Sequence, residues 1–279
     1  MSRLMWTLSG FADEISPDLE LQCSVLDELG IRHIEFRSAW GANILDLDED
    51  QLDKAAGILN RHGIRLSSVG SPIGKVGVND DFEAHQERFG RALEVAKRFE
   101  SPYIRLFSFF IPAGDDPAAH RDEVLRRMDA LVDQAAGHDV VLLHENEKEI
   151  YGDIPARCLD LVESLGSAQL RLIWDAANYV QCGVVPFTDG YESLRPYLEY
   201  VHVKDALAAD GSVTPAGEGD GQLPETFRAL RDSGFDGFFS MEPHLAHAGS
   251  AGGFSGPELF HKATNAFTGL LQAEGIEYH

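Results

Sequence analysis

Four apolar runs in the second half of the chain carry or lead into a side chain that can bind a metal ion or move a proton. Glu145, Asp175 and Glu242 stand at or just after the ends of three runs, and His202 lies inside the fourth. Three carboxylates brought together without a cation repel one another and lose their hydration. A divalent metal ion relieves both costs, and imidazole supplies a fourth ligand. Oxygen ligands with one nitrogen and no sulfur favour Mn²⁺, with Mg²⁺, Co²⁺ or Zn²⁺ as alternatives.

These side chains meet only if the four runs are neighbouring parallel strands. The chain has eight short β-branched or aromatic runs, at residues 4–8, 33–36, 65–69, 103–107, 140–143, 170–174, 200–203 and 237–241. Segments with helical spacing separate them, as at residues 52–59, 124–135 and 259–271. The alternation predicts an α/β protein, a single (β/α)₈ TIM barrel domain over residues 1–279. In such barrels the active site lies at the carboxyl ends of the strands.

Local signals agree with this division of the chain. Glycine ends three predicted helices, at Gly30, Gly63 and Gly234, and Ser16-Pro17 and Asp153-Ile154-Pro155 are typical of helix starts. An open doubly wound sheet is the competing fold. It normally carries GxGxxG after its first strand, and the LSGFAD segment lacks that pattern.

Composition narrows the range of partners. The chain has 279 residues and a formal net charge of −23, from 46 acidic and 23 basic residues. The electrostatic field of this negative charge repels phosphate backbones and anionic membranes, so we expect no nucleic-acid or membrane partner. The three cysteines are far apart and form no CxxC pair, so the sequence indicates neither a thiolate zinc site nor a disulfide framework. With no signal-peptide core and no membrane-length apolar run, we expect a cytoplasmic protein.

Further polar residues near strand ends are candidates for a substrate pocket. Glu35 lies in the second run, and Arg37 and Trp40 follow it. Lys75 follows the third run, Asn178 follows the sixth, and Lys204 shares a strand face with His202. Each of these side chains has a structural alternative, such as an ion pair or a solvated loop position. Arg105 is expected inside the barrel as an ion-pair partner, and His144 is expected to face away from the ligands and support them. The Gly217–Gly221 stretch, GEGDG, is either a turn before the next helix or a loop that closes over substrate.

The stretches HEN, WDAANY, YVHVKDA and FFSMEPH are similar to the sugar isomerase/epimerase superfamily of xylose-isomerase-like TIM barrels, over essentially the whole chain. The resembling branch holds tagatose-type 3-epimerases, hydroxypyruvate isomerases and inosose dehydratases. The resemblance implies that Glu145, Asp175, His202 and Glu242 bind the metal, and that Glu145 and Glu242 also serve as catalytic acid and base. It also implies a homo-oligomer. The sequence departs from many epimerases at Asn178, where they carry histidine, and at Asp205-Ala206, where they often carry a substrate-binding arginine.

A metal ion beside two carboxylates suits proton transfer next to a carbonyl, through an enediolate. Epimerisation, aldose–ketose isomerisation and dehydration share this intermediate, so the ligands do not choose among them. The sequence therefore predicts a metal-dependent sugar isomerase or epimerase acting on a small sugar or cyclitol. An inosose-type dehydratase or related lyase is the alternative. Further alternatives are an apurinic endonuclease using His244, His247 and His261, and a sugar-binding barrel without catalysis.

Overall fold

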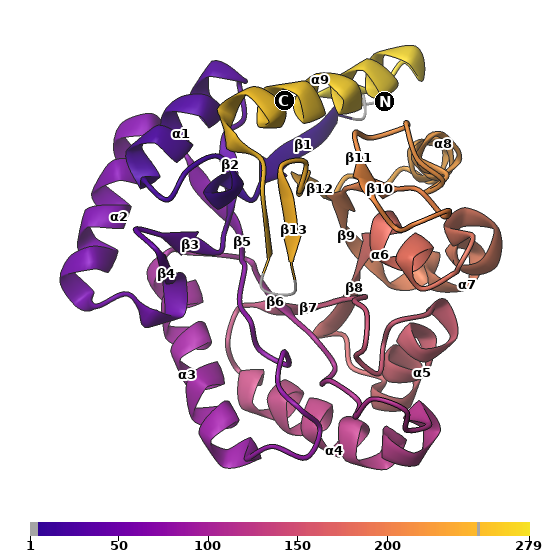
Figure 1. Ribbon diagram of the computed structural model, residues 1–279. Coiled ribbons are helices and arrows are strands. Elements are labelled where there is room, and N and C mark those ends of the chain that lie inside the picture. Colours follow the sequence, from indigo (N-terminus) through magenta and orange to yellow (C-terminus); the bar gives the residue numbers. More distant parts are fainter. Residues whose placement is uncertain (1–4, 250–251) are drawn as a thin grey trace.

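A computed structural model describes residues 5–249 and 252–279, in which strands and helices alternate along the chain (Figure 1). The central strands are β1 (Met5–Gly10), β2 (His33–Phe36), β5 (Arg65–Val69), β6 (Tyr103–Leu106), β7 (Val141–Glu145), β8 (Leu170–Asp175), β9 (Leu198–Val203) and β12 (Phe238–Met241). All eight predicted runs are strands, with Leu4 of the first run outside the described residues.

The strands form one parallel sheet that curls into a barrel. Their order is β15-β1-β12-β9-β8-β7-β6-β5-β2, and β2 lies beside β1, which brings the two ends of the series together (Figure 1). The additional strand β15 (Glu277–Tyr278) pairs with β1. The predicted α/β TIM barrel is therefore confirmed.

Helices surround the strands (Figure 1). They are α1 (Leu19–Glu28), α2 (Glu49–His62), α3 (Phe82–Arg98), α4 (Pro117–Ala135), α5 (Pro155–Leu165), α6 (Ala176–Gln181), α7 (Glu192–Leu194), α8 (Leu223–Ser233) and α9 (Gly256–Ala273). Their buried faces and the outward faces of the strands make the main core, with Trp6 stacked on Phe239 at 3.9 Å. No helix in the described part of the chain combines the length and apolarity that a membrane crossing requires.

The predicted helix ends are close to the observed ones. Gly63 and Gly234 cap α2 and α8 in the left-handed conformation, with φ of 64° and 78°. Pro155 begins α5 as predicted. The first helix starts at Leu19 rather than at Ser16-Pro17, because the Asp18 carboxylate caps it by accepting the Leu21 N–H.

Short elements occur between the main strands and helices. They comprise β3 (Ser38–Ala39), β4 (Ala42–Asn43), β10 (Asp205–Ala206), β11 (Val213–Thr214), β13 (His247–Gly249), β14 (Gly252–Phe254), and helical turns at Ala12–Glu14, Ile44–Asp46, Phe187–Tyr191 and Arg195–Tyr197. Strands β13 and β14 form an antiparallel hairpin, which crosses the middle of the barrel in the view of Figure 1. Ala248 on this hairpin shares a cavity with Asn178 and Lys204, so the hairpin contributes to the wall of that cavity.

Strand alternation sets the chemistry of the barrel interior. Leu143, Ile173 and Tyr200 pack together from β7, β8 and β9. Because side chains repeat on one face every second residue, the next inward positions on these strands are Glu145, Asp175 and His202. An apolar layer thus lies beneath a layer formed by two carboxylates and an imidazole.

Candidate metal centre

Glu145, Asp175, His202 and Glu242 converge inside the carboxyl end of the barrel. One ligand atom from each lies within 4.8 Å of the others, and all four side chains are buried. The sheet register explains the convergence, since Asp175 pairs with His202 across β8 and β9, and Ser240, two residues before Glu242, also pairs with His202. Three carboxylates and one imidazole are thereby held facing one another.

The carboxylate of Glu35 orients His202 from the side opposite the other three carboxylates. The Nε2 of His202 lies 3.1 Å from Oε2 of Glu35, and both side chains are fully buried. The opposite nitrogen, Nδ1, lies 3.2 Å from Glu145 Oε1, 3.8 Å from Asp175 Oδ2 and 3.6 Å from Glu242 Oε2. Burial disfavours the imidazolium, but Glu145 and Glu35 raise the pKa of His202 well above its ordinary value. The negative charge of these carboxylates, which favours a proton on His202, also favours a metal cation between His202 and the carboxylates.

Asp175 divides its two oxygens between a structural role and the centre. Oδ1 accepts the Asn178 N–H at 2.9 Å and caps α6, while Oδ2 faces the centre and lies 2.8 Å from Lys204 Nζ. The Asn146 side chain donates to the Asp175 carbonyl and accepts its N–H, at 2.9 and 3.1 Å. The asparagine of the HEN stretch therefore joins β7 to β8 beside the centre.

Buried basic side chains surround the two glutamates. Arg105 Nη1 lies 3.0 Å from Glu145 Oε2, as expected for an interior ion-pair partner. Burial favours the neutral acid, but His202 and Arg105 lower the pKa of Glu145. Lys204 Nζ lies 2.8 Å from Glu242 Oε2, and Lys204 and His244 lower the pKa of Glu242 well below its usual range despite its burial. Both glutamates are therefore held as carboxylates.

A cavity of about 330 Å³ opens beside these residues. Its walls come from the loops after several strands and from the hairpin: Phe110, Glu147, Lys148, Glu149, Asn178, Gln181, Lys204, Val213, His244 and Ala248. Two of the predicted substrate-binding residues, Asn178 and Lys204, are in this wall. The Asn178 amide also donates to Glu145 Oε1 at 3.3 Å, which links the cavity to the centre.

The other predicted pocket residues lie in different surroundings. Arg37 is buried between Asp13, at 2.7 Å from its Nε, and Glu242, at 3.3 Å from its Nη1. Lys75 reaches Glu147 of the cavity wall at 3.2 Å. Trp40 packs against Lys54 of α2, whose Nζ lies 4.4 Å from the centre of the indole ring, and does not line this cavity.

The GEGDG loop is a fixed turn wrapped around Asp205. The Asp205 carboxylate is fully buried and accepts the backbone N–H groups of Ala206, Gly217, Gly219 and Gly221 at 2.9–3.1 Å. A Cβ at Gly219 would approach Asp205 Oδ1 to 2.5 Å, so only glycine fits there. Of the two interpretations of this loop, the structure agrees with the turn, because backbone N–H groups of the loop are held by one buried carboxylate.

Sequence reasoning missed the support that reaches the centre from β1 and β2. Glu35 was considered only as a pocket residue, and Glu14, in the helical turn after β1, was not considered at all. Glu14 is fully buried, which raises its pKa to about 7 although His244 and Arg37 oppose the shift. The signal was the acidic pair in LSGFADE, directly after the first strand. His144 faces away from the ligands as expected, and its Nε2 lies 2.9 Å from Ser108 Oγ.

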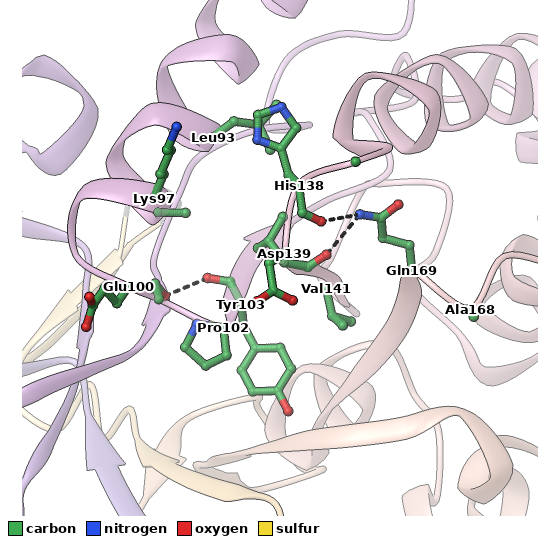
Figure 2. Close-up of a pocket in the computed structure, with 14 residues that line it drawn as sticks. Leu93, Lys97, Glu100, Pro102, Tyr103, His138, Asp139, Val141, Ala168 and Gln169 are labelled. Atoms are coloured by element: carbon green, nitrogen blue, oxygen red, sulfur yellow. Dashed lines mark hydrogen bonds between the residues drawn. The ribbon is translucent and has the colours of Figure 1, made fainter.

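A larger hollow, of about 970 Å³, lies near the amino ends of β6, β7 and β8 (Figure 2). Figure 2 shows the Gln169 amide bonded to backbone carbonyls of the neighbouring loop, those of His138 at 3.3 Å and Val140 at 3.0 Å. Ser101 donates to the Tyr103 carbonyl at 2.9 Å. This hollow is at the opposite end of the barrel from the buried carboxylates. Its size therefore does not make it the candidate active site.

Only His244 of the three histidines considered for an apurinic endonuclease belongs, within the described ranges, to a group of potential ligands. His247 is exposed on β13, and His261 on α9 lies 3.6 Å from Glu28. The geometry therefore gives no support to a three-zinc centre.

Comparison with known proteins agrees with this architecture. The profile of the family described as Xylose isomerase-like TIM barrel matches residues 23–263. A 3-dehydroshikimate dehydratase from Bacillus anthracis is 21% identical over 66% of this chain and 65% of its own length. A 2-epi-5-epi-valiolone 7-phosphate 2-epimerase from Actinoplanes sp. is 29% identical over 60% of each chain. The chain thus matches less than two thirds of the length of either curated relative.

Solved structures share the fold over nearly the full length. A D-tagatose 3-epimerase-like protein superposes with a TM-score of 0.78 at 16% identity, covering 96% of this chain and 98% of its own. The IOLI protein, solved with a zinc atom, superposes with a TM-score of 0.75 at 18% identity, covering 96% and 99%. At these identities the likeness establishes the fold.

Proposed function

This chain belongs to the xylose isomerase-like TIM barrel family, and we propose that it is a divalent-metal-dependent enzyme acting on a small sugar or cyclitol. Its first chemical step is removal of a proton from the carbon next to a carbonyl. The observation that carries the proposal is the convergence of Glu145, Asp175, His202 and Glu242 within 4.8 Å, with His202 Nδ1 aimed at the three carboxylates.

The donor set fits a metal ion of the Mn²⁺ type. Ligands bound at about 2.1 Å lie roughly 3.0 Å apart on adjacent octahedral positions and roughly 3.4 Å apart on a tetrahedron. The distances from His202 Nδ1 to the carboxylate oxygens, 3.2 to 3.8 Å, are close to these values. Mn²⁺ is favoured by the oxygen-rich set, and Mg²⁺, Co²⁺ and Zn²⁺ also suit it. When bound, the ion would supply positive charge beside the substrate oxygens.

Charge in the barrel interior also favours cation binding. Six side-chain carboxyl groups lie around the centre: Asp13, Glu14, Glu35, Glu145, Asp175 and Glu242. The basic side chains among them are those of Arg37, Arg105 and Lys204, with His202 as a fourth positive charge when it is protonated. Buried carboxylates without matching cations are costly. A divalent ion reduces that excess where it is greatest.

Glu145 and Glu242 are the two candidate proton carriers. Both are ionised, and they enter from β7 and from the end of β12. One carboxylate accepts the proton from the substrate carbon and later releases it to solvent. The other first takes up a proton from solvent and donates it to the opposite face or to the neighbouring carbon. Lys204 and Asn178 in the cavity wall then hold the substrate hydroxyl or carbonyl oxygens by hydrogen bonds. The barrel floor of Leu143, Ile173 and Tyr200 excludes water from below.

The reaction that follows proton removal is an epimerisation or isomerisation in our proposal. The curated epimerase relative supports this, while the dehydratase relative keeps dehydration as the second candidate. The test is incubation of the Mn²⁺-loaded protein with ketoses and inososes in D₂O. Deuterium entering the substrate carbon, lost in Glu145→Gln and Glu242→Gln, supports proton transfer. A product lighter by one water identifies the dehydratase, and no exchange with any substrate that binds refutes the catalytic proposal.

A further inference from the structure

Glu242 presents its two carboxylate oxygens to two different groups of side chains. Oε2 faces the centre described above, at 3.6 Å from His202 Nδ1. Oε1 faces the opposite way and lies 3.4 Å from His244 Nε2 and 3.3 Å from Arg37 Nη1. The second oxygen therefore belongs to surroundings that the proton-transfer proposal does not use.

Glu14 completes those surroundings with one carboxylate oxygen that has no hydrogen-bond partner in the described part of the chain. Its Oε2 accepts the backbone N–H of His244 at 2.8 Å and the Ser255 hydroxyl at 3.0 Å. Its Oε1 is buried, makes no hydrogen bond to any residue in the ranges 5–249 and 252–279, and lies 3.2 Å from His244 Nε2. His244 Nε2 likewise makes no hydrogen bond within these ranges. Two ligating atoms that are buried and unsatisfied thus point at each other beside Glu242 Oε1.

The backbone is strained to hold this arrangement. His244 has φ of 48°, in the left-handed region that non-glycine residues rarely adopt. The hairpin packs directly on its ring, since a Cβ at Gly253 would come within 1.9 Å of an imidazole carbon. Strain of this kind persists where surrounding contacts over-determine the conformation, often at functional sites. Here it turns the imidazole of His244 inward, toward Glu14.

We propose a second divalent-cation site formed by Glu14 Oε1, His244 Nε2 and Glu242 Oε1. The three atoms lie within 4.8 Å of one another, and the two nitrogen–oxygen distances, 3.2 and 3.4 Å, match the edge of a tetrahedron around an ion with bonds of about 2.1 Å. Two carboxylates and an imidazole, with one position left open, suit Zn²⁺, Co²⁺ or Mn²⁺. Glu242 then bridges two ions, as carboxylates do in two-metal sites with ions about 3.5–4 Å apart.

Arg37 makes the second site weaker than the first. Its guanidinium is beside Glu242 Oε1, so it repels a cation there, although its Nε is held by Asp13 at 2.7 Å. A carboxylate oxygen has two lone pairs, so Oε1 can accept Arg37 and bind an ion together. The first site has four protein ligands and the second has three. Binding in two steps is expected, with the Glu14 site filling last.

The inference rests on the proposed function only through the shared ligand Glu242, and the test separates the two. Metal-free protein is titrated with Mn²⁺ while free Mn²⁺ is followed by electron paramagnetic resonance. The wild type should bind two ions per chain, with a spin-coupled signal at the second equivalent. Glu14→Gln and His244→Gln should each bind one ion without coupling. His247→Gln, which changes an exposed histidine on the same hairpin, should behave as the wild type.

The other outcomes distinguish failure of the second site from failure of the first. One ion per chain in the wild type, unchanged in Glu14→Gln and His244→Gln, overturns the second site and leaves the first intact. No ion in the wild type overturns both. His244→Gln leaves the Glu14 side chain in place, so it tests the site even if Glu14→Gln fails to fold. Thermal unfolding curves of the metal-free variants provide the check on folding.

Discussion

The buried carboxylate of Asp205 allows a quantitative prediction about the loop that follows β10. Oδ1 accepts the N–H groups of Ala206 and Gly221, and Oδ2 accepts those of Gly217 and Gly219. Asp205→Asn replaces one acceptor oxygen with an NH₂ group, which then faces two N–H donors. A buried donor left without an acceptor costs about 1–3 kcal/mol, so two such donors cost roughly 2–6 kcal/mol. The free energy of unfolding should fall by that amount.

Urea denaturation of Asp205→Asn, followed by far-ultraviolet circular dichroism, measures the change. Glu218→Gln is the matched control, because Glu218 is exposed in the same loop and its replacement should shift stability by less than about 0.5 kcal/mol. A loss below about 1 kcal/mol in Asp205→Asn, with an unchanged urea dependence, would refute the reasoning. A raised KM without loss of stability would instead show that the loop closes over substrate.

Three further predictions concern the centre and the pH dependence of stability. Glu35→Gln should weaken metal binding about 10–100-fold, measured by calorimetry, because Glu35 orients His202 from behind. Saturating Mn²⁺ at about 100 times its Kd should stabilise the protein by about 2.7 kcal/mol, which removal by a chelator reverses in a thermal melt. Burial lowers the pKa of His85 to about 4, and its Nε2 accepts the Gly74 N–H. Since the unfolded state takes up a proton near pH 6.5 and the folded state only near 4, His85 should reduce stability as pH falls through that window, by up to about 3 kcal/mol. His85→Gln should flatten that part of the stability profile relative to wild type, and equal slopes would contradict the assignment.

The barrel was predictable because its signals are local. Apolar runs, glycine caps such as Gly63 and proline starts such as Pro155 all depend on a few neighbouring residues. Glu145, Asp175, His202 and Glu242 were identifiable as candidates for the same reason, since each stands at a strand end and consecutive barrel strands are neighbours. The structure places these four side chains together, and their role as metal ligands is part of our proposal.

The supporting contacts were not predictable from spacing. His202 is bonded to Glu35 across the barrel, 167 residues away, and Glu14 is bonded to the His244 backbone over 230 residues. The acidic pair after the first strand marks Glu14 as a candidate, but a single sequence does not show which side chains meet across the barrel interior. The position of Trp40 beside Lys54 of α2 has the same origin, because a tryptophan near a strand end can pack outward as easily as into the pocket.

The central claim is that the four converging side chains bind a divalent metal ion, and metal content tests it most directly. Protein purified under metal-replete conditions, and then dialysed, is analysed by mass spectrometry for bound metals, beside Asp175→Asn and the exposed control His247→Gln. The account predicts at least one tightly held divalent ion per chain in the wild type and the control, and its loss in Asp175→Asn. An absence of bound metal in the wild type, or equal metal content in Asp175→Asn, would contradict it.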